Sequence, residues 1–222
     1  MSDLGELIYF PVMAKGLQLA CIAEMSGLPW TGFTTEEEGP KSWKELKESG
    51  VAPFGQMPLL KTPSGLTLGQ STAIANYIAK MAGPALEGES DADYALSQML
   101  MAEAEDIYAL MGSCELANWK TPEQREAGAE KAKKFFDEDL AKHFKNLEEL
   151  ARSDVSDEGK HSDCRFTSVS AAVPHRLHRP HKLTGDVVQT GHTAGEIYLM
   201  GMIHQAVLAG AVPARLSGSL LP

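Results

Sequence analysis

Cysteine is scarce in this chain, with three among 222 residues: Cys21, Cys114 and Cys164. A disulfide framework needs a larger and usually even set, and no two of these cysteines form a Cys-x-x-Cys pair. The sequence therefore argues against a disulfide-stapled fold and favours a reducing compartment.

Long apolar runs and positive charge are also in short supply. No apolar run approaches the ~20 residues of a membrane helix, and the opening MSDLGELIYF is acidic where a signal peptide would be basic. Lys and Arg number 20 against 30 Asp and Glu, a net charge of −10. This balance argues against nucleic-acid and anionic-membrane partners. We expect a cytoplasmic, globular protein of one or two domains.

The charge is unevenly distributed along the chain. Residues 1–152 hold 24 acids and 14 Lys or Arg, whereas residues 153–222 hold six of each. The same final segment contains six of the seven histidines. A change of composition this sharp indicates a boundary.

Short strands and helices alternate over the first 83 residues. Apolar runs predict strands over Leu7–Phe10, Met57–Leu60 and Leu66–Leu68. After a loop around Lys15-Gly16, helical spacing and breakers predict helices from Leu17 to about Gly27, over Ser42–Glu48 and from Gln70 to near Gly83. With one further strand in the polar stretch before the second helix, the order is β-α-(β)-α-β-β-α, a small α/β domain.

Three sequence blocks carry a resemblance: Ile8–Phe10, Pro53–Leu60 and Gly69–Ile78. In this order and spacing they resemble the thioredoxin-like half of cytosolic glutathione transferases, with the tyrosine-type sigma and mu group as the nearest pattern. The resemblance implies a thioredoxin-like N-terminal domain followed by an all-α C-terminal domain. It also implies glutathione as co-substrate, no metal, a small electrophile as second substrate and a homodimer.

Tyr9 matches the catalytic tyrosine of the family. A thiol with a pKa near ~8.5 is mostly protonated at neutral pH, and a hydrogen bond from a fixed donor stabilises its thiolate. A phenol stays protonated there and can donate. The alternative role for Tyr9 is packing in the core. Dithiol chemistry would require a cysteine at the start of the first helix. Cys21 instead lies further along, on the apolar face of the helix.

The resemblance implies further glutathione contacts. Pro58 matches a cis-proline that leaves the backbone of Met57 free to pair with glutathione, although a trans edge proline would also fit the spacing. Gln70 and Ser71 match a pair at a helix N-terminus suited to a carboxylate, where Ser71 could equally be the N-cap. The other candidates are Lys15, Trp43, Lys47 and Gln56.

The remaining chain is mostly helical. Ser90–Ser113 and a segment from Pro122 to about Ala151 show helical patterns, and Thr193-Ala194-Gly195-Glu196 is a capping box that opens another helix. Asp106 matches an aspartate that in the sigma and mu group reaches across the dimer to the amine of glutathione. We expect the helical domain over residues 90–222 and the glutathione-binding domain over residues 1–83.

The pattern of the family is interrupted over residues 153–192, which we expect to be an irregular or inserted loop. His175, His178 and His181 recur there at a spacing of three, but Pro174 and Pro180 oppose a helix and no nearby ligand completes a metal site. The tail Ala206–Pro222 is also short and rich in glycine, proline and alanine, whereas the family normally carries further helices past this point. An altered splice product or a gene-model error would explain both departures.

The sequence therefore predicts a glutathione transferase that activates the glutathione thiol for attack on electrophiles. A glutathione-dependent isomerase, similar to prostaglandin D synthases of the family, is one alternative. A glutathione-transferase-like protein without catalytic activity is the other.

Overall fold

The computed structural model describes residues 3–10, 12, 14–36, 42–114, 121–156 and 192–211. The described residues fall into two compact units. The first takes its residues from Met1–Met101 and Pro180–Gly201, and the second from Ala102–Arg179 and Met202–Pro222.

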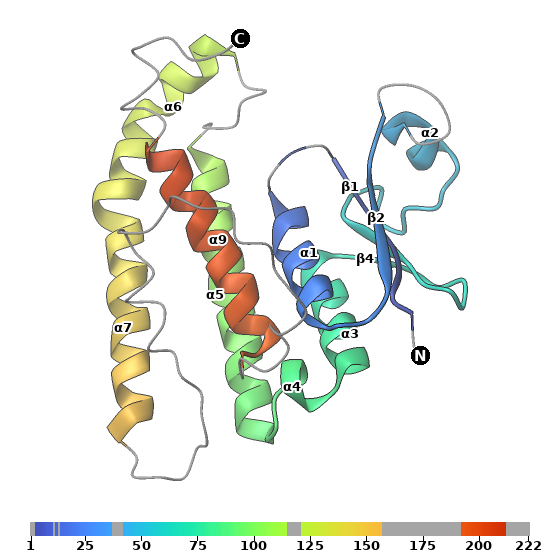
Figure 1. Cartoon of the computed structure of the whole chain (residues 1–222). Helices are drawn as coiled ribbons and strands as arrows, with labels where there is room; N and C mark the ends of the chain where they lie inside the picture. Colours follow the sequence, from blue (N-terminus) through green and yellow to red (C-terminus); the bar gives the residue numbers. More distant parts are fainter. Residues whose placement is uncertain are drawn as a thin grey trace. The chain divides into compact units, whose positions relative to one another are not determined.

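The first unit contains a four-stranded sheet with strand order β2-β1-β3-β4. Its strands are β1 (Gly5–Tyr9), β2 (Trp30–Thr34), β3 (Leu59–Lys61) and β4 (Thr67–Gly69). Its helices are α1 (Lys15–Met25), α2 (Trp43–Glu48) and α3 (Ser71–Ala82). Strands β1 and β2 are parallel, whereas β3 is antiparallel to both β1 and β4. This order confirms the predicted α/β domain and locates its further strand at β2 (Figure 1).

Both faces of this sheet are covered. Helices α1 and α3 pack against each other and against the strands, and they contribute Leu19, Ile22, Ile74 and Ile78 to the core. On the opposite face, Ile8 and Leu59 form a buried cluster with Leu46 of α2 and with Ala52. Successive strand residues point to opposite faces, so Leu7 belongs to the α1 and α3 side.

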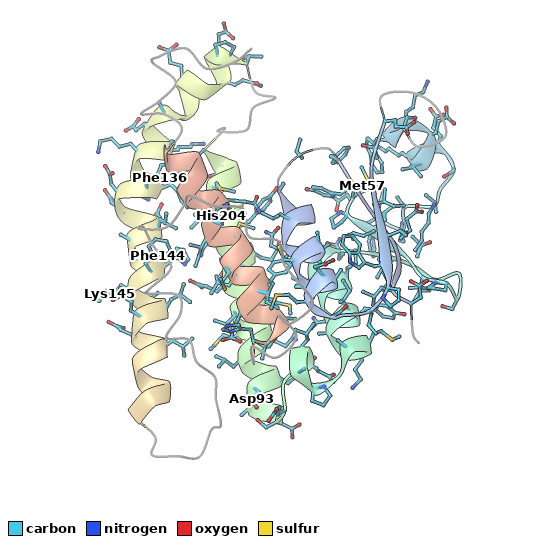
Figure 2. The ribbon with its side chains drawn as sticks, viewed as in Figure 1. Met57, Asp93, Phe136, Phe144, Lys145 and His204 are labelled. Atoms are coloured by element: carbon cyan, nitrogen blue, oxygen red, sulfur yellow. The ribbon has the colours of Figure 1, made fainter. Side chains whose placement is uncertain are left out.

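Helix α5 (Asp91–Ser113) follows the short helix α4 (Pro84–Glu87). Ser90 caps this helix, because its backbone N–H donates to the Asp93 carboxylate at 3.0 Å and the Asp93 N–H donates to Ser90 Oγ at 3.2 Å. Asp93 is labelled in Figure 2. Within the first unit, the side-chain amides of Asn76 and Gln98 exchange two hydrogen bonds of 2.9 and 2.6 Å, which tie α3 to α5.

The second unit contains α6 (Pro122–Lys134), a π-helical turn η1 (Phe135–Asp139) and α7 (Leu140–Ser156). The predicted helix from Pro122 is therefore present, with a π turn inside it, and it continues past Ala151. Phe135 is buried at this turn and stacks edge-on against Phe136 at 4.9 Å between ring centroids. Phe136 and Phe144 of this helical segment are labelled in Figure 2.

Helix α9 (Ala194–Ala211) begins with the predicted capping box. The Thr193 backbone N–H donates to the Glu196 carboxylate at 2.7 Å, and both residues are buried. The Gly195 N–H donates to Ser97 Oγ of α5 at 2.9 Å. None of the helices within the described ranges is long and apolar enough to cross a membrane.

Candidate functional site

The register of the sheet brings three of the predicted site residues into one row. Leu59 of β3 pairs with Ile8 of β1 on one side and with Gly69 of β4 on the other. Because the paired strands run in opposite directions, the residue before Leu59 is level with the residue after Ile8 and with the residue after Gly69. Pro58 therefore lies beside Tyr9 and Gln70 at the same end of the sheet.

The loop before β3 contains a cis peptide bond between Met57 and Pro58. The sequence left cis and trans open, and the structure has the cis form. Met57 packs against the buried cluster of Ile8 and Leu59 and is labelled in Figure 2, whereas Gln56 before it is exposed.

Helix α2 places Trp43 and Lys47 near this loop. Ser42 begins the helix as its N-cap, with its Oγ accepting from the Glu45 N–H at 3.2 Å. Trp43 is half-buried against the Ile8 and Leu59 cluster. Lys47 is exposed, and its Cε lies 3.9 Å from the position of a β-carbon on Gly55.

A chain of aromatic contacts connects Tyr9 with α2. The rings of Tyr9 and Phe10 meet edge-on at 5.7 Å between centroids. Phe10 in turn meets Trp43 edge-on at 5.8 Å. Both geometries are favourable for aromatic pairs. Phe10 thus links the candidate thiol-activating residue with a second candidate site residue, a role that sequence reasoning missed.

Gln70 and Ser71 lie where β4 passes into α3. Gln70 has a φ of 67°, which makes it the one described non-glycine residue with a positive φ, and its side chain is exposed. Ser71 is buried and is the first residue of the helix, so it is not the N-cap. Residues in such backbone conformations concentrate at functional sites because they persist only where the surrounding structure holds them.

The other two predicted site residues have different settings. Lys15 is half-buried at the first position of α1, in the same unit as Tyr9. Asp106 lies on α5 in the second unit, with an exposed side chain. Glu103 on the same helix forms a 2.5 Å hydrogen-bonded pair with Nδ1 of His143.

Cys21 has the character of a packing residue. It is half-buried in α1, and burial raises the pKa of its thiol above the ordinary value. A raised pKa lowers the thiolate fraction at neutral pH, which is the opposite of what a redox nucleophile needs.

We expect Cys21 in the native protein to be alkylated slowly at neutral pH, because a thiol with a raised pKa is mostly protonated. The rates of alkylation in the native and the urea-unfolded protein measure this. Cys114 provides a control and should also react slowly, because burial raises the pKa of its thiol too. Alkylation of Cys21 as fast in the native as in the unfolded protein would contradict its role as a packing residue.

No group of three or more histidine, cysteine, aspartate or glutamate side chains suited to a metal ion occurs within the described ranges. His175, His178 and His181, considered as metal ligands from the sequence, lie outside the described residues, as does Cys164.

Part of the chain is similar in sequence to known glutathione transferases. Residues 31–80 match the model of the glutathione S-transferase N-terminal domain. A curated relative, probable glutathione S-transferase 6 of Caenorhabditis elegans, is 33% identical over 87 residues. That alignment covers 39% of this chain and 39% of the relative.

Two solved structures share the fold. Prostaglandin synthase D of Nilaparvata lugens is 16% identical, with a TM-score of 0.62 over 93% of this chain and 82% of that one. The sigma class glutathione transferase of Fasciola hepatica is 20% identical, with a TM-score of 0.57 over 92% and 80%. Over its N-terminal part, the chain is therefore similar to glutathione S-transferases in sequence, and its fold is shared with solved members of that family.

Proposed function

We propose that this protein is a glutathione transferase in which Tyr9 stabilises the thiolate of bound glutathione. The observation that carries the proposal is the row of Tyr9, Pro58 and Gln70 at one end of the sheet in a domain of this family. The aromatic contact from Phe10 to Trp43 connects this row with α2.

The chemistry requires one hydrogen bond from a fixed donor. A thiol with an ordinary pKa of about 8.5 loses its proton more readily when the thiolate accepts a hydrogen bond, and each unit of pKa corresponds to about 1.4 kcal/mol. The proton goes to solvent. The thiolate sulfur then forms a bond to the electrophilic carbon, and the leaving group departs with its electron pair.

The remaining residues are proposed to hold the tripeptide. The Met57 backbone next to Pro58 pairs with the glutathione backbone as an added strand would. Gln70 and Ser71 face the γ-glutamyl carboxylate, which the N-terminus of α3 also attracts. Lys47, with Trp43 beside it on α2, pairs with the glycyl carboxylate.

Three further candidates complete the proposed binding site. Lys15 and Gln56 contribute polar contacts, Lys15 as a cation. Asp106 is proposed to reach the glutathione amine of the partner in a homodimer.

The proposed location of the protein is the cytoplasm, and its proposed partners are glutathione, a small electrophile and a second copy of the chain. The helical domain is proposed to span residues 90–222 and the glutathione-binding domain residues 1–83.

Gln70→Gly should make the protein more stable and weaken its binding of glutathione. Glycine adopts a positive φ without steric cost, and relief of strain worth about 1–3 kcal/mol outweighs the ~0.5–1 kcal/mol entropic cost of glycine. We expect the free energy of unfolding to rise by about 1 kcal/mol, while loss of the side-chain amide weakens glutathione binding. Urea denaturation and glutathione titration measure the two effects.

The matched control for this prediction is Gln70→Ala, which removes the amide but keeps the β-carbon and its strain. It should lose the affinity without gaining the stability. A Gln70→Gly variant less stable than Gln70→Ala would contradict the strain argument.

The proposed function is tested by retention on immobilised glutathione, followed by a conjugation assay with a generic aromatic electrophile. Retention with conjugation supports the proposal. Retention with turnover of an isomerase substrate alone favours the glutathione-dependent isomerase. Retention without turnover indicates a non-catalytic relative, and no retention at all contradicts the proposed binding site.

A further inference from the structure

Gly16, in the first turn of α1, lies directly against the ring of Tyr9. A β-carbon placed on Gly16 would come within 2.5 Å of Tyr9 Cδ1 and 2.8 Å of Cγ. It would also lie 3.2 Å from Tyr9 Cβ. These atoms are at the backbone end of the tyrosine side chain, so they cannot swing aside as a flexible tip could. Any side chain at position 16 must therefore displace the ring.

The backbone of α1 gives no other reason for a glycine here. Gly16 is not among the glycines with a positive φ, and alanine is the better helix former. Gly112 of α5 is a useful contrast, because a β-carbon on this helical glycine would meet nothing within 4 Å. The close approach of Tyr9 is what distinguishes position 16.

Phe10 supports the Tyr9 ring at a second contact. The two rings meet edge-on at 5.7 Å with an interplanar angle of 66°. Phe10 is itself held against Trp43, and Trp43 packs on the buried cluster of Ile8 and Leu59. The tyrosine ring therefore contacts both the first turn of α1 and an aromatic chain anchored in the core.

We propose that Gly16 is a positioning residue for Tyr9, whose missing side chain lets the ring approach α1 and, together with Phe10, fixes the direction of the phenolic hydroxyl. This inference rests on the proposed role of Tyr9 as donor to the glutathione thiolate. Hydrogen bonds weaken steeply as their angle closes, and a displacement of about 1 Å can reduce turnover about 100-fold. The fixed ring is thus what makes the donor effective.

The test measures the pKa of the bound glutathione thiol, from thiolate absorbance against pH, together with kcat/KM. Gly16→Ala should raise this pKa toward the value found in Tyr9→Phe and lower kcat/KM by roughly 10- to 100-fold. Gly112→Ala, the same substitution in a helix with open space around it, should keep the parental values.

A double variant separates positioning from general damage. If Gly16 acts through the Tyr9 hydroxyl, adding Gly16→Ala to Tyr9→Phe should raise the thiol pKa no further. Additive effects of the two substitutions would overturn the inference, because they would show that Gly16 acts by another route.

Phe10→Leu is the second variant, for the case in which Gly16→Ala does not fold. It removes the other ring contact without adding an atom, and it should also raise the thiol pKa. A folded Gly16→Ala with the parental thiol pKa overturns the inference, as does a parental value in Phe10→Leu if Gly16→Ala does not fold. A parent protein that forms no bound thiolate refutes the proposed function itself, which is a distinct result.

Discussion

Tyr9→Phe should lower kcat/KM for glutathione conjugation by about 10- to 150-fold. A hydrogen bond to a charged group contributes about 1.5–3 kcal/mol, and each 1.4 kcal/mol is a factor of about ten in rate. Phenylalanine keeps the ring that contacts Gly16 and Phe10, so the substitution removes the donor with little change in packing.

The loss of turnover in Tyr9→Phe should depend on pH. The donor favours the thiolate and lowers the pKa of the bound thiol, so its loss raises that pKa. Turnover of Tyr9→Phe should therefore recover as the pH increases, whereas the parent is already active near neutral pH. Kinetics across a pH series and retention on immobilised glutathione distinguish lost activation from lost binding.

Tyr94→Phe is the matched control, since Tyr94 lies on α5 with 46% of its surface exposed and has no proposed site role. It should show parental kinetics at every pH. Parental kcat/KM in Tyr9→Phe would mean that another group supplies the hydrogen bond, and the packing role of Tyr9 would then be the correct one.

The fold of the first unit was largely predictable because its strands and helices have strong local signals. Apolar runs predicted β1, β3 and β4, and glycine and proline predicted the ends of the helices. Strand β2 was harder to locate because its sequence, WTGFT, contains no apolar run. Its Thr31 and Gly32 are exposed in the structure, so these positions do not require apolar side chains. The π turn at Phe135–Asp139 also has no local signal, because its residues continue a helical pattern.

The candidate site was predictable only in part, because its residues come from segments that are far apart in the sequence. The family order predicted Tyr9, Pro58 and Gln70, and the strand register brings them into one row. The positive φ of Gln70 was not predictable, since such a conformation normally indicates glycine. The contact between Gly16 and Tyr9 depends on how α1 packs after the turn, which no sequence spacing specifies.

Gly195→Ala should cause the largest loss of stability among these substitutions. A β-carbon on Gly195 would overlap the carbonyl oxygen of Ser97 and lie 2.6 Å from Ser97 Cα. These are backbone atoms of α5, so no side-chain rotation relieves the contact and the two helices must separate. Overpacking of this kind costs about 3 kcal/mol or more, well above the ~1 kcal/mol that alanine gains as a helix former.

Urea denaturation of the parent and of two comparison variants measures this cost. Gly112→Ala has open space around its new β-carbon and should gain up to about 1 kcal/mol. Ser97→Ala removes the oxygen that accepts from the Gly195 N–H and should lose about 1–2 kcal/mol without any clash. If the close approach of α9 to α5 is what requires glycine, Gly195→Ala must be less stable than Ser97→Ala. The reverse order would mean that the hydrogen bond, and not the space, determines the residue at position 195.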